Sequence, residues 1–101
     1  MNVILIYSTF PSRKQALKTG EGLVKNKLAG CVNVFPVASV YAWQGKIIKD
    51  KEWVMIAKTK KSNYQKAEKY IVARHPYKTP CVLEIPVRRV AKKYNSWLEQ
   101  Y

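Results

Sequence analysis

Few side chains in this sequence could carry out chemistry. The chain has one histidine, two cysteines and six acids, namely His75, Cys31, Cys81, Glu21, Asp50, Glu52, Glu68, Glu84 and Glu99. A zinc or copper centre within one chain takes about three or four such ligands. None of these residues falls at a recognisable metal-ligand spacing. Around a symmetry axis, however, one histidine or carboxylate from each chain could complete a ligand set.

His75 has two readings on this basis. It directly precedes Pro76, where a helix is expected to end, so its ring could bond the last helical carbonyls. The other reading is a metal ligand. Cys31 and Cys81 lie in apolar contexts without a Cys-x-x-Cys spacing, which favours two small packing residues over a disulfide.

Catalytic motifs are missing. Ser8 and Thr9 follow an apolar run, but no Gly-x-Ser-x-Gly surrounds them and no second histidine could act as a base. No glycine-rich phosphate loop is present either. We therefore expect a protein without enzymatic activity.

The two closest carboxylates are Asp50 and Glu52, which alternate onto the same face of a predicted strand. Lysines surround them in the sequence. We expect these acids to pair with Lys46, Lys49 or Lys51.

The N-terminal third predicts a strand and a helix. Residues 3–7 are apolar at every position, which indicates a strand buried on both faces. Ser12 and Gln15 form a capping-box pattern, so a helix is expected to begin there. Apolar residues then recur at helical spacing as far as Leu28, and Gly30 is the expected stop.

A long hairpin is predicted next. One strand begins at Cys31, its partner runs from Ile47 to Thr59, and Gln44 with Gly45 forms a two-residue turn. This turn places Trp43 opposite Lys46, Tyr41 opposite Ile48 and Ser39 opposite Asp50. Pro36 lacks an N–H donor, which indicates an edge strand.

The remainder predicts a helix, a strand and a short terminal helix. A second capping-box pattern at Ser62 and Gln65 is expected to open a helix that ends at His75. Residues 81–85 predict the last strand, and apolar residues from 90 to 101 predict the terminal helix. The order β-α-β-β-α-β predicts an α+β, ferredoxin-like sandwich in a single domain, residues 1–101.

Charge and hydropathy limit the classes of partner that the chain is expected to bind. The net charge of +13 could attract nucleic acid or anionic surfaces, but the lysines form no block, which favours solvated faces. The RNA-recognition signature is missing from the third strand, and Tyr41, Trp43 and Trp53 are expected to pack rather than to stack on bases. No apolar run is long enough for a membrane span, and we expect a cytoplasmic protein.

The pattern also predicts an oligomer. Helices of a two-layer sandwich cover one face of the sheet, yet the first and third strands are apolar on both faces. A homo-oligomer would bury the second face, and the long hairpin would offer edge hydrogen bonds to a neighbour.

Taken together, several segments resemble the CutA divalent-cation tolerance proteins over nearly the whole chain. They are residues 8–11, 28–33, 41–47, 58–59 and 75–77 with Pro80, and Tyr94 with Trp97 and Leu98. The resemblance implies a ferredoxin-like homotrimer, similar to PII signalling proteins, in which hairpins join neighbouring subunits. It also implies a role in the response to copper and other divalent cations in the cytoplasm, with no catalytic activity.

The resemblance further implies a site between subunits. Its metal ligand would be His75, with Cys81 as a replacement soft ligand, because Ser8 and Arg74 stand where some family members have a cysteine and a second histidine. The expected inter-subunit cleft is lined by Tyr41, Trp43, Glu52, Lys58 and Tyr77 together with His75. The alternative function is a PII-like sensor of a small molecule or anion, with Lys58 and Arg74 as anion contacts.

Overall fold

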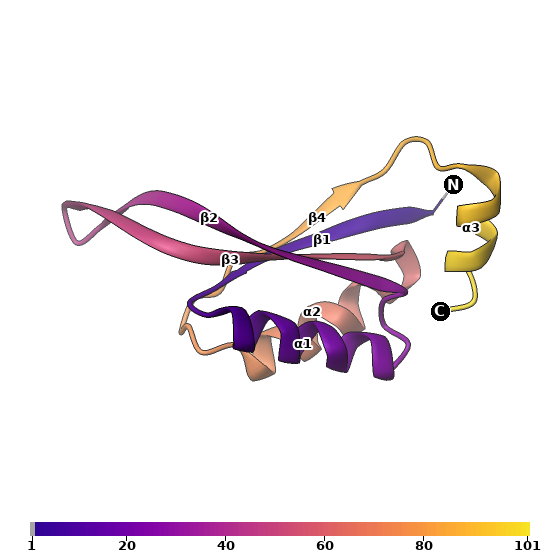
Figure 1. The fold of residues 1–101 in the computed structure, drawn as a ribbon, viewed down its shortest axis with the longest axis horizontal. Helices are drawn as coiled ribbons and strands as arrows, with labels where there is room; N and C mark the ends of the chain where they lie inside the picture. The colour runs from indigo at the N-terminus through magenta and orange to yellow at the C-terminus, as the bar shows by residue number, and fades with distance from the viewer. Residues whose placement is uncertain (1) are drawn as a thin grey trace.

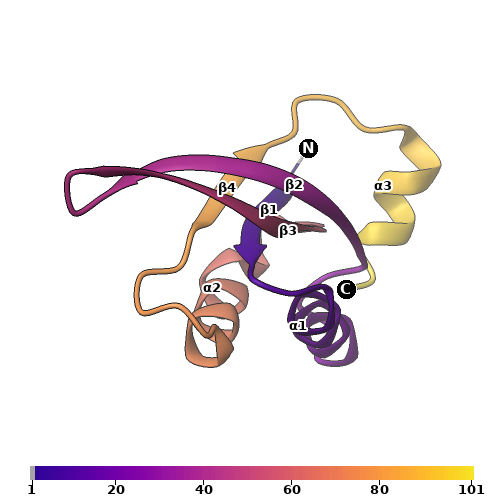
Figure 2. The same ribbon diagram turned by 60° about the vertical axis from the view of Figure 1, so that its left-hand side comes forward.

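The computed structural model describes residues 2–101 and has the predicted order of elements. These are β1 (Val3–Phe10), α1 (Arg13–Lys25), β2 (Cys31–Trp43), β3 (Lys46–Lys60), the 3₁₀ turn η1 (Lys61–Asn63), α2 (Tyr64–Arg74), β4 (Val82–Pro86) and α3 (Lys92–Leu98). The strands form one antiparallel sheet in the order β2-β3-β1-β4. Helices α1 and α2 cover one face, and α3 lies apart from them at one end of the sheet (Figures 1 and 2). The α+β fold class is thereby confirmed.

The core lies between the sheet and the two helices. Alternate residues of β1 point toward α1 and α2, and Ile4, Ile6 and Phe10 are at most 2% exposed. Their partners from the other elements are Ala16, Leu23, Ala29, Met55, Ala57, Ala67 and Ile71. Gly20 lets α1 approach β2 closely, because a Cβ at that position would lie 2.6 Å from a methyl group of Val32.

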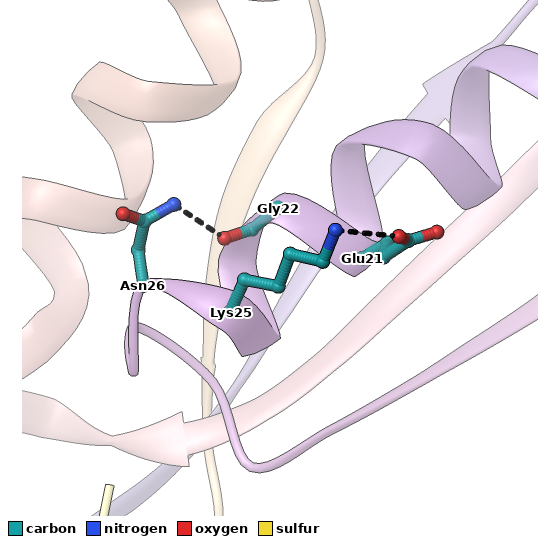
Figure 3. A network of polar contacts seen from close by, with 4 residues as sticks. All are labelled: Glu21, Gly22, Lys25 and Asn26. Carbon is teal, nitrogen blue, oxygen red and sulfur yellow. Dashed lines mark hydrogen bonds and ion pairs between the residues drawn. The ribbon is translucent and has the colours of Figure 1, made fainter.

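The start of α1 is as predicted, whereas the predicted stop at Gly30 is wrong. The Ser12 hydroxyl accepts the Gln15 N–H at 3.2 Å, as a helix cap does. The helix ends at Lys25 because Lys27 adopts a left-handed conformation with φ 56°, and the N–H groups of Lys27 and Leu28 bond back to the carbonyls of Val24 and Leu23 at 3.1 and 2.8 Å. The Asn26 side chain also donates from Nδ2 to the Gly22 carbonyl at 2.8 Å (Figure 3). Gly30 instead serves close packing, since a Cβ there would collide with Leu98 of α3.

The second capping-box prediction, at Ser62 and Gln65, is also wrong. Ser62 lies inside the 3₁₀ turn, so the cap position of α2 falls on Asn63. The Asn63 side chain makes no cap bond and donates instead to Thr59 Oγ1 at 3.0 Å. The predicted end of this helix is confirmed, because Arg74 is its last residue and His75 its C-cap.

Strands β2 and β3 extend beyond the sheet as a two-stranded arm. The last β1 pair, Phe10 opposite Trp53, marks where the other strands stop, and the arm continues to the turn at Gln44 and Gly45. Both turn residues have positive φ, 51° and 75°, and the predicted register is confirmed throughout. The arm accounts for the elongated shape, 46 Å in its longest dimension (Figure 1).

The face of the sheet opposite α1 and α2, here called the open face, is apolar as predicted. Strand alternation places on it Leu5, Tyr7, Phe35, Val54, Ile56, Leu83 and Ile85. Leu83 is 51% exposed, and Phe35 and Ile85 are each 39% exposed. Helix α3 covers only one end of the sheet, where Leu98 is buried.

Candidate functional site

His75 is held at the junction between α2 and the end of β1. Its Nδ1 accepts the Tyr77 backbone N–H at 3.1 Å, so the ring proton lies on Nε2, which donates to the Thr9 carbonyl at 2.8 Å. Phe10 stacks on the ring with centroids 4.3 Å apart. Burial is the main cause that lowers the pKa of His75, although the Thr9 carbonyl and Glu52 oppose this shift. The imidazole is therefore neutral at pH 7, and both of its nitrogens are engaged.

Glu52 lies beside this histidine as a buried carboxylate on β3. Its Oε2 accepts the Tyr77 hydroxyl at 2.8 Å, and the Tyr77 ring lies 4.9 Å from the His75 ring. Burial and the bond to Glu52 both raise the pKa of Tyr77. Tyr77 thus connects Glu52 and His75, and we call Thr9, Glu52, His75 and Tyr77 the histidine cluster.

The predicted lysine partners of Asp50 and Glu52 are wrong. Asp50 accepts a hydrogen bond from the Tyr41 hydroxyl at 2.6 Å across the arm. Lys49 and Lys51 alternate onto the opposite strand face, whereas Tyr41 is the diagonal cross-strand neighbour of Asp50. Among residues 2–101 there is one ion pair, between Lys25 and Glu21 at 3.1 Å, and it involves neither Asp50 nor Glu52.

Cys81 is the predicted metal-site thiol that lies near the histidine cluster. It precedes β4 directly and is half-buried, and burial is the main cause that raises its pKa, with a smaller contribution from Glu52. The thiol form is therefore favoured over the thiolate, which is the form that binds metals. Cys31 opens β2 opposite Lys58, and both cysteines are free.

Two predicted cleft residues lie away from the cluster in the same chain. Lys58 is six residues from Glu52 along β3, roughly 20 Å at about 3.3 Å per residue. Trp43 lies at the tip of the arm, opposite Lys46, which is equally far from Glu52 in the other direction. Arg74, the second predicted anion contact, instead stacks its guanidinium on the Tyr70 ring of α2, 3.7 Å from the ring centroid.

The described residues of one chain do not form a metal centre by themselves. Within residues 2–101, no group of three or more histidine, cysteine or acidic side chains lies close enough to hold a metal ion. The His75 nitrogens are already bonded, and the Cys81 thiol is held in its protonated form. A divalent cation does not fit this arrangement without further ligands.

Sequence reasoning did not identify two residues around His75. Thr9 contributes a backbone carbonyl, which any residue type would supply, so no sequence signal could reveal it. Phe10 has the apolar character of a core residue and belongs to the core, and it also stacks on the imidazole of His75. Ser8, which the resemblance places where some family members have a cysteine, is fully buried on the helix-facing side of β1, and its hydroxyl has no hydrogen-bond partner among residues 2–101.

The four-stranded antiparallel sheet, two helices on one face and a protruding arm define a ferredoxin-like α+β protein. The family model of the CutA1 divalent ion tolerance protein matches residues 4–101. The chain belongs to this family.

Individual relatives agree with this assignment. The divalent-cation tolerance protein CutA of Thermotoga maritima is 38% identical over 98 residues, which cover 97% of each chain. The structure of the Archaeoglobus fulgidus protein, described as a periplasmic divalent cation tolerance protein, matches with a TM-score of 0.95 at 37% identity, over 97% of this chain and 96% of that one. CutA1 from Oryza sativa matches with a TM-score of 0.95 at 33% identity, over 99% and 93%.

These comparisons confirm the predicted family. They leave the cellular location open, because one relative is described as periplasmic whereas the sequence led us to expect the cytoplasm. No helix formed by residues 2–101 combines the length and the apolar character needed to cross a membrane.

Proposed function

We propose that this chain is a divalent-cation-response protein that works as a homotrimer. The open face carries the proposal, because Leu83, Ile85 and Phe35 are exposed there on an otherwise packed sheet. Burying such a patch contributes about 25 cal/mol for each Å² of apolar surface, before the costs of association are subtracted. A second and third copy of the same chain would cover these faces around a three-fold axis.

The arm supports the same assembly. Beyond Phe10 and Trp53, β2 and β3 pair only with each other, and the tip side chains Trp43 and Ile47 are 60% and 70% exposed. An isolated two-stranded hairpin is marginally stable in water. Contact with a neighbouring subunit would stabilise the arm and would bury these side chains.

Assembly would also complete the cleft around the histidine cluster. Trp43 and Lys58 each lie roughly 20 Å from Glu52 along β3 or across the hairpin, so a single chain cannot bring them to Tyr77 and His75. The arm of a neighbour would supply Trp43. We place the functional cleft between subunits for this reason.

We assign Cu(II) or another divalent cation to this assembled cleft, with His75 and Cys81 as the residues to test; the cation would displace the Tyr77 N–H from the lone pair of His75 Nδ1. Isothermal titration of the wild-type chain with Cu(II) is expected to give a saturable isotherm. The signal should be lost in His75→Ala and weakened in Cys81→Ser. Isotherms that match the wild type in both variants would place any metal site elsewhere. The proposed trimer would not be affected by that result, because the solution mass of the chain tests it separately.

The second candidate function is a small-molecule or anion sensor that uses the same cleft. Both nearby acids are bonded to phenol hydroxyls, at 2.6 Å for Asp50 and 2.8 Å for Glu52, and His75 is neutral. Such groups recognise a hydrogen-bonding ligand as readily as a cation. A melting-shift screen separates the two functions, since divalent metals should raise the melting temperature under the first and nucleotides or organic anions under the second.

The proposal includes no catalytic step and places the protein in the cytoplasm. The neutral imidazole accepts a backbone N–H through Nδ1 and donates to a carbonyl through Nε2, which leaves no nitrogen ready to act as a base. Fractionation of cells with an antibody against the chain would test the location.

A further inference from the structure

The outer surface of α1 and α2, facing away from the sheet, is strongly basic. Helix α1 contains four cations and α2 three, against one glutamate in each. All seven cations are exposed, namely Arg13, Lys14, Lys18, Lys25, Lys66, Lys69 and Arg74. Glu21 pairs with Lys25 at 3.1 Å (Figure 3), and Glu68 accepts the Tyr64 hydroxyl at 2.9 Å. The layer therefore presents a net positive charge to solvent.

A stripe of these cations runs along α1. Lys14, Lys18 and Lys25 recur at helical spacing on the side opposite the buried residues Ala16 and Leu23. Glu21 lies on the same side and pairs with Lys25, which leaves Lys14 and Lys18 as the cations of the stripe without an acidic partner among residues 2–101. From Lys14 to Lys25 the stripe is about 16 Å long at about 1.5 Å per residue. A nucleic acid duplex carries one negative charge for about every 1.7 Å of its axis, so roughly ten phosphate charges would pass over the stripe.

The neighbouring part of α2 is fixed against this stripe. A shallow depression is lined by four cations of α1, by one acid and one apolar residue of the same helix, and by Tyr70 of α2. The α1 residues are Arg13, Lys14, Leu17, Lys18, Glu21, Gly22 and Lys25, and Asn26 follows the helix. The Tyr70 hydroxyl lies against Gly22, where any Cβ would collide with it. The Arg74 guanidinium stacks on the Tyr70 ring, 3.7 Å from the ring centroid. Tyr70 is thereby held in place beside the cations of α1.

We infer that this outer helix surface binds the phosphate backbone of a nucleic acid duplex without sequence specificity. Helices that lie in a membrane surface insert Trp, Phe or Leu side chains, and the Lys14–Lys25 stripe has none. Leu17 and Val24 at its flanks are 40% and 36% exposed and Val72 of α2 is 48% exposed, which sets three apolar side chains against the seven exposed cations of this surface. Charge complementarity thus favours a phosphate backbone over a bilayer. This surface lies on the opposite side of the sheet from the open face, so the inference is independent of the proposed trimer.

The test compares two charge-reversal variants of the full chain. Lys14→Glu with Lys18→Glu changes the α1 stripe, whereas Lys92→Glu with Lys93→Glu makes the same change in net charge on α3. Fluorescence anisotropy with a labelled DNA duplex of random sequence measures binding between about 50 and 200 mM salt. The neutral pair Lys14→Gln with Lys18→Gln gives an intermediate step, and circular dichroism verifies that each variant is folded.

We expect the wild-type chain to bind with a steep loss of affinity as salt rises. The α1 variant should bind at least about ten-fold more weakly, and its salt slope should fall by about two, since two phosphate contacts are removed. The α3 variant should stay within about two-fold of the wild type. Equal losses in both variants, no binding by the wild type at low salt, or binding only to phosphatidylserine vesicles would overturn the inference.

Discussion

The two faces of the sheet are built from the same strands, yet their apolar side chains are buried on one face and exposed on the other. On the helix-facing side, Ile4, Ile6 and Phe10 are at most 2% exposed beneath α1 and α2. On the open face, Leu83 is 51% exposed and Ile85 39%, although both are as apolar as the core residues. One chain therefore buries the apolar side chains of only one face of its sheet. The apolar side chains of the open face are left exposed by this chain alone.

The largest effect is expected on the helix-facing side. Phe10→Ala should lower the free energy of unfolding by about 3–5 kcal/mol, because it leaves a cavity under α2 and removes the ring stacked on His75. Urea unfolding at fixed protein concentration measures this loss. Leu17→Ala, at a 40% exposed position on α1, is the control and should cost less than about 1 kcal/mol. Equal losses would mean that the helix-facing side is not the core.

The next effect concerns the open face. Leu83→Asp together with Ile85→Asp should weaken self-association at least about a hundred-fold, or about 2.8 kcal/mol, because charged groups would have to be desolvated at the interface. Light scattering coupled to size exclusion should then give the mass of a monomer with a native far-ultraviolet spectrum. Leu17→Asp on the helix side should leave the mass unchanged. A native mass for the double variant would show that this face is not an interface.

A smaller effect separates two identical sequence patterns. Ser12→Ala should cost about 1 kcal/mol, since Ser12 accepts the Gln15 N–H and caps α1. Ser62→Ala should cost almost nothing, because Ser62 lies in the 3₁₀ turn and α2 has no side-chain cap bond. Thermal unfolding of the two variants measures this difference. Equal costs would contradict the geometry of η1.

The smallest effect is a pH dependence from His75. Burial lowers the pKa of this residue below its ordinary value of 6.5, so the unfolded chain binds the proton more tightly than the folded chain. Its contribution to stability is therefore fully present above pH 6.5 and is lost as the pH falls from there through the lower, folded pKa. His75→Phe should remove this slope. An NMR titration that gives a His75 pKa above 6.5 would reverse the sign and refute the prediction.

The hairpin and the order of elements could be predicted because they depend on local chemistry. Gln44 and Gly45 permit positive φ, which fixes the register of the arm, and the apolar alternation of β3 fixes which side meets the helices. The helix boundaries at Gly30 and Ser62 could not be predicted in this way. The first helix ends where Lys27 adopts a positive φ of 56°, for which a lysine gives no sequence signal, and Ser62 is taken up by the 3₁₀ turn η1 before α2 begins.

The site was predictable only in part. His75, Tyr77 and Glu52 were expected in one cleft, and the structure does bring them together. The bonds that neutralise and occupy the imidazole come from the Thr9 carbonyl and the Tyr77 N–H, which are backbone groups without a sequence signature. Trp43 and Lys58 stay remote from Glu52 within one chain, so this chain's own fold does not bring them into the predicted cleft.

The solution mass of the wild-type chain tests the central claim most directly. Size exclusion with light scattering at micromolar concentration is predicted to give about three times the 11.7 kDa of one chain. Such a mass, together with its loss in Leu83→Asp with Ile85→Asp, would show that copies of the chain cover the open face. A mass of 11.7 kDa across the same concentrations would contradict the account, because the apolar open face would then be stable in water without a partner.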